Sequence, residues 1–300
     1  MERPDNVPPA SRRVGALSSS EDPAGRRGHA RRLIVNADDF GRSASINAAV
    51  IRAHREGILT SASLMVNEPS CEEAVDLAKQ NPRLGVGLHL TLLGGRAALA
   101  PDKIPGLVNS SGEFANHPVA VGLKYFFRPG LRAQLESEMA AQFEKFRATG
   151  LKLDHLNGHL HLHLHPVVFG ILMRRARDWG LTHLRLTRDP FWLNTRLAGG
   201  AWLYRASHAV IYRTLSAGAR GALVERGIQF VPNVFGLLQN GRVDERYVTR
   251  LLSALPPGDS ELYSHPSLAE FKNERDALIS PAVRALIRAQ NIELIRYQDL

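Results

Sequence analysis

The chain alternates short apolar runs with longer segments in which apolar residues recur at helical spacing. Short apolar runs are typical of buried parallel strands, whereas the longer segments are typical of helices that cover a sheet. The strands predicted from the runs are residues 32–37, 58–66, 84–90, 154–159, 183–187, 228–231, 261–266 and 292–297. The predicted helices are residues 43–57, 70–79, 129–150, 166–178 and 243–254, a helical region that ends near residue 225, and a helix that begins at Pro281.

Alternating strands and helices favour a parallel α/β architecture. No glycine-rich dinucleotide-binding motif follows the first strand, so a (β/α) barrel fits better than an open nucleotide-binding sheet. We expect a single deformed (β/α) barrel of about seven strands over residues 31–300. Residues 1–30 are rich in Pro, Ser, Gly and Arg and lack apolar periodicity, which is typical of a disordered tail.

One polar stretch, residues 154–166, holds five of the twelve histidines. Its histidines and Asn157 occupy odd positions, and mostly leucines lie between them. In an extended strand this alternation places imidazoles on one face and leucines on the other. The stretch is too long for one ordinary strand. We therefore expect the strand to end near His159, the chain to turn, and Pro166 to open a helix.

Polar residues also end several other predicted strands: Asp38 and Asp39, His89, and His265. Each of these features has a simpler interpretation when it is considered alone. An Asp pair after a strand is usually a turn or helix cap, His89 would be a packed imidazole, and the histidine-rich stretch would be an adventitious nickel-binding tract. In barrels, however, this rim is where ligands and catalytic groups lie. One carboxylate and two imidazoles would leave an open position on a divalent ion, as in catalytic metal sites. A second carboxylate could take a proton from water, and a histidine opposite it could protonate a leaving group.

These motifs together resemble the YdjC-type carbohydrate deacetylases, relatives of the NodB-type polysaccharide deacetylases. The resemblance covers roughly residues 31–300 and rests on Asn36-Ala37-Asp38-Asp39-Phe40-Gly41, Gly87-Leu88-His89-Leu90, the histidine-rich stretch and Tyr263-Ser264-His265-Pro266. It implies that Asp39, His89 and His159 bind one divalent metal, with Asp38 as general base and His265 as general acid. Water activated by the metal would attack the amide carbonyl. Zinc suits this ligand set best, while Mg, Co, Ni and Mn also fit.

Within that family the chain is most similar to the hopanoid-biosynthesis-associated subgroup. The similarity rests on His155-x-Asn157-Gly158-His159, Gly94-Gly95-Arg96 and residues 124–129. It implies removal of acetyl from an N-acetylglucosaminyl hopanoid. Many members of the family carry Asp where this chain has Asn157, so the charge at that position is weaker here. The neighbouring Asp154 is a candidate replacement, and the roles of His161, His163 and His165 stay open.

Charge is unevenly distributed along the chain, whose formal net charge is +9. Residues 174–226 contain ten arginines, three acidic residues and all three tryptophans. Interfacial aromatic rings and arginines favour a peripheral membrane contact through residues 191–220. The alternative is an ordinary amphipathic helix with Leu203, Ala206 and Val210 turned inward. No nucleic-acid-binding module is recognisable.

Other features exclude some classes of protein. The single Cys71 cannot form an internal disulfide, and no apolar run is long enough to cross a membrane. No apolar segment of a signal peptide follows the N-terminal charges, so we expect a cytoplasmic protein, with the inner face of the membrane as a second location. Nothing in the sequence indicates an oligomeric state.

The leading function is a metal-dependent N-deacetylase of an amino-sugar conjugate or glycolipid. The first alternative is the same reaction on soluble chito-oligosaccharides. An amidohydrolase-type enzyme fits less well, because that superfamily usually places His-x-His on the first strand and this chain has Asp38-Asp39 there. A non-catalytic metal- or lipid-binding protein is the alternative from another class.

Overall fold

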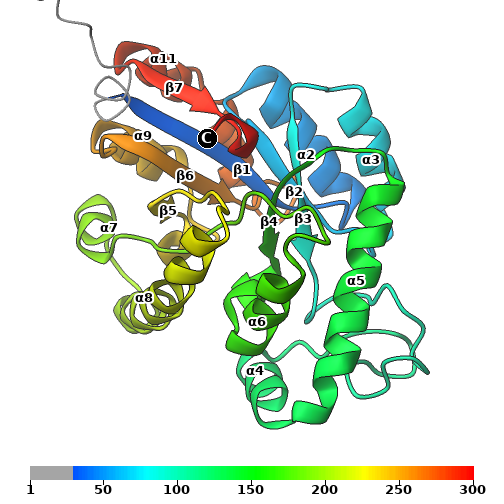
Figure 1. The fold of residues 1–300 in the computed structure, drawn as a ribbon. Coiled ribbons are helices and arrows are strands. Elements are labelled where there is room, and N and C mark those ends of the chain that lie inside the picture. Colours follow the sequence, from blue (N-terminus) through cyan, green and yellow to red (C-terminus); the bar gives the residue numbers. More distant parts are fainter. Residues whose placement is uncertain (1–29) are drawn as a thin grey trace, which may run out of the picture.

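A curled parallel sheet of seven strands organises the molecule in a computed structural model that describes residues 30–300 (Figure 1). The strand order is β4-β3-β2-β1-β6-β5, with β7 paired to β1. The strands are β1 (Arg31–Phe40), β2 (Ser61–Leu64), β3 (Gly85–Leu90), β4 (Leu153–Gly158), β5 (Asn233–Phe235), β6 (Gly258–Ser264) and β7 (Ile292–Ile295). The predicted α/β class is therefore confirmed. The predicted tail lies, except for residue 30, outside the described residues.

Strand β1 is the centre of the sheet because three strands pair with it. Strand β6 pairs along residues 31–37 on one edge. On the other edge β7 pairs with residues 31–34 and β2 takes over at Asn36. The eight residues from Leu33 to Phe40 are all buried, so the strand carries the aspartates at its carboxyl end out of a fully packed core.

Helices surround the outer face of this sheet (Figure 1). They are α2 (Ala44–Glu56), α3 (Cys71–Lys79), α4 (Pro118–Phe127), α5 (Arg132–Ala148), α6 (Pro166–Arg175), α7 (Phe191–Leu197), α8 (Trp202–Glu225), α9 (Glu245–Ser253), α10 (Lys272–Ile279) and α11 (Pro281–Ala289). Short 3₁₀ segments are η1 (Pro129–Leu131), η2 (His159–Leu164), η3 (Leu237–Gln239) and η4 (Tyr297–Asp299).

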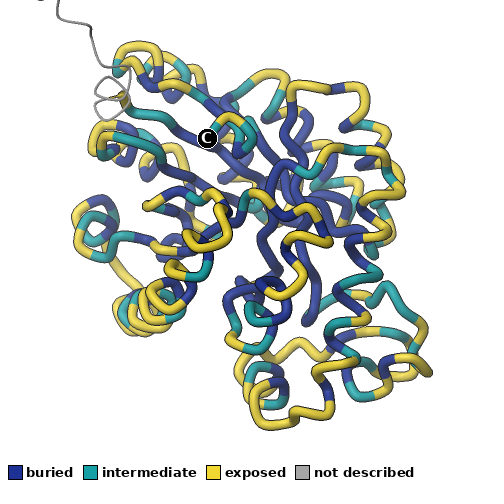
Figure 2. Tube along the Cα trace, viewed as in Figure 1, coloured by how far each residue is buried: buried dark blue, intermediate teal, exposed yellow. Residues whose placement is uncertain are grey.

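Helix α5 shows how these helices are held. Its residues Leu135, Met139, Phe143 and Phe146 recur at helical spacing, as predicted, and all are buried. Burial of each such side chain contributes about 1.5–3 kcal/mol to stability. Figure 2 shows the result along the whole chain, with buried positions concentrated in the strands and exposed positions on the outer turns of the helices.

The barrel is only half closed. Strands β4 and β5 are the two ends of the strand order. The part of the chain between them pairs only through isolated bridges, Leu156 with Leu184 and His183 with Gln229. Residues 183–187, predicted as a strand, therefore pair only at single positions. The strand predicted at residues 228–231 was wrong, since β5 begins at Asn233. Helix α4 forms in a segment to which the sequence assigned no element.

The histidine-rich stretch folds as predicted up to its turn. Strand β4 ends at Gly158, η2 follows, and Pro166 opens α6. Leu160 and His161 adopt left-handed backbone angles, with φ of 49° and 57°. These conformations end the strand alternation, so the later histidines of the stretch have separate surroundings.

Helix α8 is unusually exposed for so apolar a helix. It buries only Arg205, Ser216, Ala219 and Leu223. Leu203 is 90% exposed and Val210 is 67% exposed, so the alternative that turned both residues inward is wrong. Among residues 30–300, the helices are all too short or too polar to cross a bilayer.

Candidate metal and catalytic site

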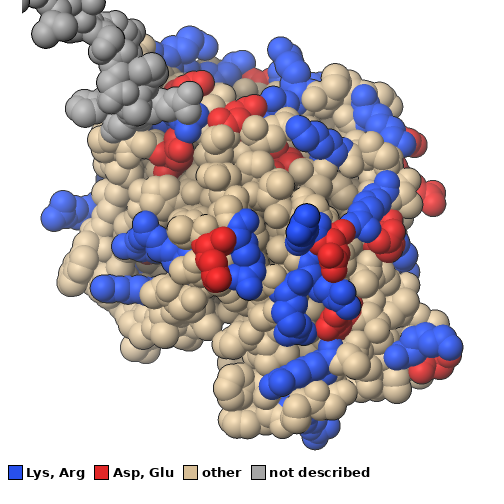
Figure 3. All heavy atoms as spheres, in the orientation of Figure 1, with Lys and Arg blue, Asp and Glu red and all other residues tan. Residues whose placement is uncertain are grey.

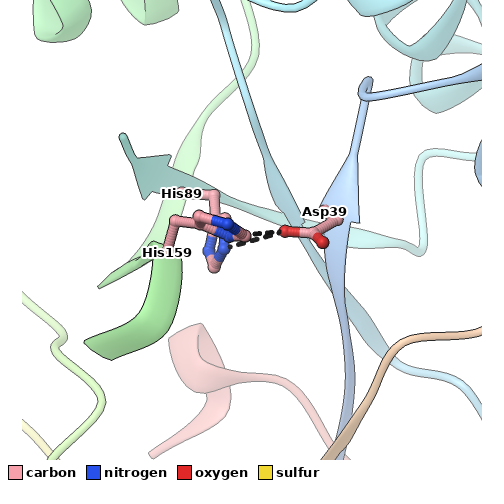
Figure 4. A group of neighbouring side chains, drawn as sticks. All are labelled: Asp39, His89 and His159. Atoms are coloured by element: carbon pink, nitrogen blue, oxygen red, sulfur yellow. Dashed lines mark hydrogen bonds and ion pairs between the residues drawn. The ribbon is translucent and has the colours of Figure 1, made fainter. Parts of the chain in front are cut away.

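Asp39, His89 and His159 converge at the carboxyl ends of β1, β3 and β4 (Figure 4). Oδ1 of Asp39 lies 3.2 Å from Nε2 of His89 and 3.0 Å from Nδ1 of His159. Their candidate ligand atoms all lie within 4.8 Å of one another, and all three residues are buried. One carboxylate and two imidazoles form a ligand set that suits a divalent ion such as zinc. The structure thus brings together the three residues that the resemblance implied as metal ligands.

The backbone at Asp39 sets the direction of its carboxylate. Its φ is +63°, in the left-handed region, and Gly41 follows with φ of +91°. This left-handed turn interrupts the alternation of side chains along the end of β1. The second oxygen, Oδ2, accepts a 2.9 Å hydrogen bond from Arg42. Asp39 is thereby left with one oxygen directed at the imidazoles.

The charges at this cluster favour an ionised carboxylate. Burial opposes ionisation of Asp39, but the charge and hydrogen bond of His159, together with the His89 contact, hold its pKa well below the usual range. Burial also opposes protonation of His89, and the facing Asp38 and Asp39 outweigh it, so the pKa of His89 is raised. A cation is therefore electrostatically favoured between these groups.

Asn157 fixes the orientation of His89. Its Oδ1 lies 2.7 Å from Nδ1 of His89, so the imidazole donates from Nδ1. Its Nδ2 donates to Asp38 at 3.0 Å and to Ser63 at 2.8 Å. With the proton on Nδ1, Nε2 of His89 is the nitrogen that would coordinate an ion held by Asp39. Asp154 does not replace this residue, because its carboxylate contacts Ser61 and His155.

Asp38 is buried beside the candidate metal ligands and held by Arg185. The guanidinium donates to Oδ2 at 2.7 Å and to Oδ1 at 2.9 Å. Burial favours the neutral acid, but the charge of Arg185 outweighs it and holds the pKa of Asp38 well below its usual range. Asn36 adds a longer 3.3 Å hydrogen bond. Asp38 is thus a fixed, ionised proton acceptor next to the three candidate ligands.

Arg185 is the main site residue that the sequence did not reveal. It has no exposed surface and pairs with Glu261 as well as Asp38. Glu261 is also fully buried and accepts a hydrogen bond from the hydroxyl of Tyr297. The available signal was an arginine between two leucines in the middle of a predicted strand, residues 183–187, where a buried charge needs a partner.

His265 lines a cavity together with two of the candidate metal ligands. The cavity has a volume of about 130 Å³, and its walls include Asp38, His89, His159 and His265. Nδ1 of His265 lies 4.0 Å from the buried carboxylate of Glu274, which also accepts the backbone N–H of His265 at 2.6 Å. Four of the five predicted site residues therefore line this cavity. The fifth, Asp39, contacts His89 and His159, which are two of those four. All five thus gather at one end of the sheet.

The other histidines of the stretch support this arrangement from different sides. His155 lies inside the half-barrel, 3.0 Å from Ser63, and a Cβ at Gly87 would lie only 2.5 Å from its ring. His161 contacts the hydroxyl of Tyr263 at 2.9 Å and lines the cavity. Burial lowers the pKa of His163 to about 3, so this residue stays neutral while it bonds to the carbonyl of Arg185. His165 bonds to the carbonyl of Gly122 in α4.

Several proteins of known sequence resemble this chain. A "Carbohydrate deacetylase" of Brevibacillus brevis is 41% identical over 151 residues, which cover 49% of this chain and 56% of that protein. A "Carbohydrate deacetylase" of Clostridium beijerinckii is 29% identical over 281 residues, which cover 90% of this chain and 100% of that protein. The chain thus spans little more than half the length of the first relative and the whole of the second.

A solved structure from Enterococcus faecalis, named there as a candidate cellobiose-phosphate cleavage protein, has the same fold. Its TM-score is 0.70 at 21% identity, and the match covers 90% of this chain and 98% of that one. The family model described as "YdjC-like protein" matches residues 32–289, which include every residue of the site described above. The chain therefore belongs to the YdjC-like protein family.

Proposed function

We propose that the protein is a metal-dependent N-deacetylase that hydrolyses the acetamide of an N-acetylglucosamine conjugate. The observation that carries this proposal is the placement of Asp38 and His265 in one cavity with His89 and His159, beside Asp39. The name "Carbohydrate deacetylase" of the relatives in Brevibacillus brevis and Clostridium beijerinckii supports it.

Each residue has a distinct role in this proposal. Asp39, His89 and His159 would hold one divalent ion, with zinc the best match to two imidazoles and a carboxylate. When bound, such an ion supplies Lewis acidity, which polarises a carbonyl and lowers the pKa of water. Asp38, kept ionised by Arg185, accepts the proton of the attacking water. His265, on another side of the cavity, donates a proton to the departing amine.

The substrate we propose is an N-acetylglucosaminyl hopanoid. The motifs at residues 94–96, 124–129 and 155–159 support this choice through their resemblance to the hopanoid-associated subgroup. In the structure, residues 124–127 belong to α4, whose first residue, Pro118, lines the site cavity. Soluble chito-oligosaccharides are the alternative substrate, and the name "Carbohydrate deacetylase" of the relatives favours them.

A peripheral membrane contact would bring the enzyme to such a substrate. Exposed apolar side chains lie on both sides of the cavity: Trp192, Trp202, Leu203, Val210 and Ile211 from residues 191–220, and Leu123, Phe126 and Phe127 from α4. Pro118 of α4 and His208 of α8 both line the cavity. Figure 3 shows the surface hollowed between these two parts of the molecule. Interfacial aromatic residues with nearby arginines support a surface contact of this kind.

Acetate release tests the function directly. The protein is stripped of metal, reconstituted with zinc and given N-acetylglucosaminyl hopanoid or diacetylchitobiose. We expect zinc-dependent acetate from the hopanoid substrate, loss of activity in Asp38→Asn, and full activity in the exposed control Asp102→Asn. Acetate from diacetylchitobiose alone would move the substrate to soluble sugars. Absence of acetate from both substrates would contradict the enzyme and favour a non-catalytic metal- or lipid-binding protein.

A further inference from the structure

A second, larger cavity lies beside the site, between α7 and α8. Its volume is about 430 Å³, within the range of cavities that hold small-molecule ligands. Phe191, Trp192 and Leu193 line it from α7, and Ala206, Ala209 and Val210 line it from α8. We refer to it as the α7–α8 groove. Its walls are mostly apolar and aromatic, and Arg188, Asp189 and Arg213 are the charged residues among them.

The groove adjoins the site cavity, and the two share part of their walls. Tyr212 and Leu237 line both spaces. The Tyr212 ring lies edge-on to His161 at 5.2 Å, and its hydroxyl donates to the carbonyl of Leu160, next to the metal ligand His159. A molecule with its polar end in the site and an apolar end beyond Tyr212 would therefore contact both spaces.

Small side chains keep the groove open. Ala206 and Ala209 lie three positions apart on one face of α8, and Val210 lies next to them. Larger side chains at these positions would fill the space, as they do along the buried face of α5. Apolar walls without a covering side chain gain stability when an apolar ligand displaces water from them.

We infer that the α7–α8 groove binds the apolar aglycone of the substrate, while the acetamido sugar occupies the site. This inference rests on the proposed function and adds a specificity site to it. An extended or polycyclic hydrocarbon on the sugar fits the apolar walls. A second sugar would place most of its hydroxyl groups against Phe191, Trp192 and the alanines of α8, with polar partners only near Arg188, Asp189 and Arg213. Selectivity for lipid-linked substrates then resides in the groove and not at the metal ligands.

The test compares octyl and methyl β-N-acetylglucosaminide, both below the micellar concentration. Each buried methylene contributes about a fourfold gain in affinity, so we expect at least a tenfold preference of the wild-type enzyme for the octyl glycoside in kcat/KM. Ala209→Phe fills the groove and should bring the ratio of the two kcat/KM values close to one. The ratio cancels any uniform loss of folded enzyme. Thr214→Phe, an exposed position on the same helix that lines neither cavity, should keep the wild-type ratio.

Calorimetric binding of the two glycosides separates this inference from the proposed function. If no acetate is released but the octyl glycoside binds more tightly than the methyl glycoside and Ala209→Phe abolishes the difference, the groove is confirmed and the reaction is wrong. Equal binding of both glycosides to the wild-type protein would overturn the groove. A second result would also overturn the groove as the aglycone site. If the protein binds vesicles and Ala209→Phe leaves the preference for the octyl glycoside unchanged, the apolar surface binds a membrane instead.

Discussion

Oδ1 of Asn157 accepts a 2.7 Å hydrogen bond from Nδ1 of His89, and the same side chain donates to Asp38. One carboxamide therefore orients a candidate metal ligand and the candidate base together. A carboxylate at this position would accept from His89 equally well but would face Asp38 with like charge. The asparagine that departs from the common family pattern is thus matched to both of its neighbours.

We expect Asn157→Leu to weaken zinc binding about 10- to 100-fold, because His89 loses the partner that fixes its tautomer. Asn157→Asp retains an acceptor and should keep the affinity within about threefold. Ser63→Ala, which removes a partner of Asn157, Asn36 and His155 but leaves the Asn157–His89 hydrogen bond in place, serves as the control. Competition with a chromophoric chelator measures the affinity. Equal zinc affinity of Asn157→Leu and the wild-type protein would contradict the role of Asn157.

Replacement of Arg185 tests the buried ion-pair network. Arg185→Met leaves Asp38 and Glu261 as buried carboxylates without their cation. We expect the free energy of unfolding to fall by about 3–5 kcal/mol at neutral pH, measured by urea denaturation. The exposed Arg177→Met should change it by less than about 0.5 kcal/mol. A loss below about 1 kcal/mol for Arg185→Met would show that other groups compensate the two carboxylates.

The loss of activity on replacement of His265 should increase with the basicity of the leaving group. His265→Gln should lower kcat for an N-acetyl amino sugar by a factor of about 100 or more, because the departing amine needs a proton. 4-Nitrophenyl acetate has a leaving group that needs no protonation, so its hydrolysis should fall less than about tenfold. An equal loss on both substrates, measured by steady-state kinetics, would refute the assignment of His265 as general acid.

Asp189 should make stability depend on pH. Burial raises its pKa to about 7, although it accepts hydrogen bonds from Leu238 and Asn194. The unfolded chain has the ordinary Asp pKa of about 3.9, so the folded state holds this proton more tightly. This group therefore stabilises the fold least above pH 7, and its contribution falls as pH rises from about 4 to 7.

Asp189→Asn removes this ionisable group. We expect the variant to lose the part of the decline in unfolding free energy between pH 5 and pH 8 that this proton causes, in urea titrations at each pH. The difference in unfolding free energy between Asp189→Asn and the wild-type protein should therefore favour the variant more at pH 8 than at pH 5. The exposed Asp178→Asn should retain the wild-type slope. The same slope in wild-type and Asp189→Asn proteins would show that Asp189 is ionised throughout this range.

Metal binding should stabilise the folded protein by mass action. Zinc at 100 times its dissociation constant adds about 2.7 kcal/mol to the free energy of unfolding, so the melting temperature should rise by several degrees. Asp39→Asn keeps a residue that tolerates the left-handed backbone at this position but lacks the anionic ligand, so most of the rise should disappear. Calorimetry with and without zinc provides the measurement. A full zinc response in Asp39→Asn would exclude Asp39 as a ligand.

The pattern of polar residues at strand ends predicted Asp38, Asp39, His89, His265 and the histidine-rich stretch as neighbours, and the family resemblance singled out His159 within that stretch. Parallel strands place their carboxyl ends on one rim, so Asp38, Asp39, His89, His159 and His265 converge whatever the exact length of each strand. The length of the alternating stretch, too great for one strand, likewise predicted the end of β4 near His159. These are local signals, and the sheet only brings them together.

Long-range pairing was not readable in the same way. Arg185 meets Asp38 across 147 positions, and nothing near either residue marks that pair. The apolar run at residues 228–231 is partly buried without forming a strand, because burial does not require strand pairing. Helix α4 was missed since Gly122 and the flanking prolines resemble a loop. The exposure of α8 followed from tertiary packing, which leaves Leu203 and Val210 outside the core.

The left-handed backbone at Asp39 limits what mutation can place there. Among ordinary residues, only glycine, asparagine and aspartate adopt this conformation at little cost. Descendants of this protein that lose the reaction while keeping the fold should therefore carry Asn or Gly at this position far more often than Ala, Ser or Val. In a genome survey, the residue at this single position would distinguish active relatives of the enzyme from inactive ones.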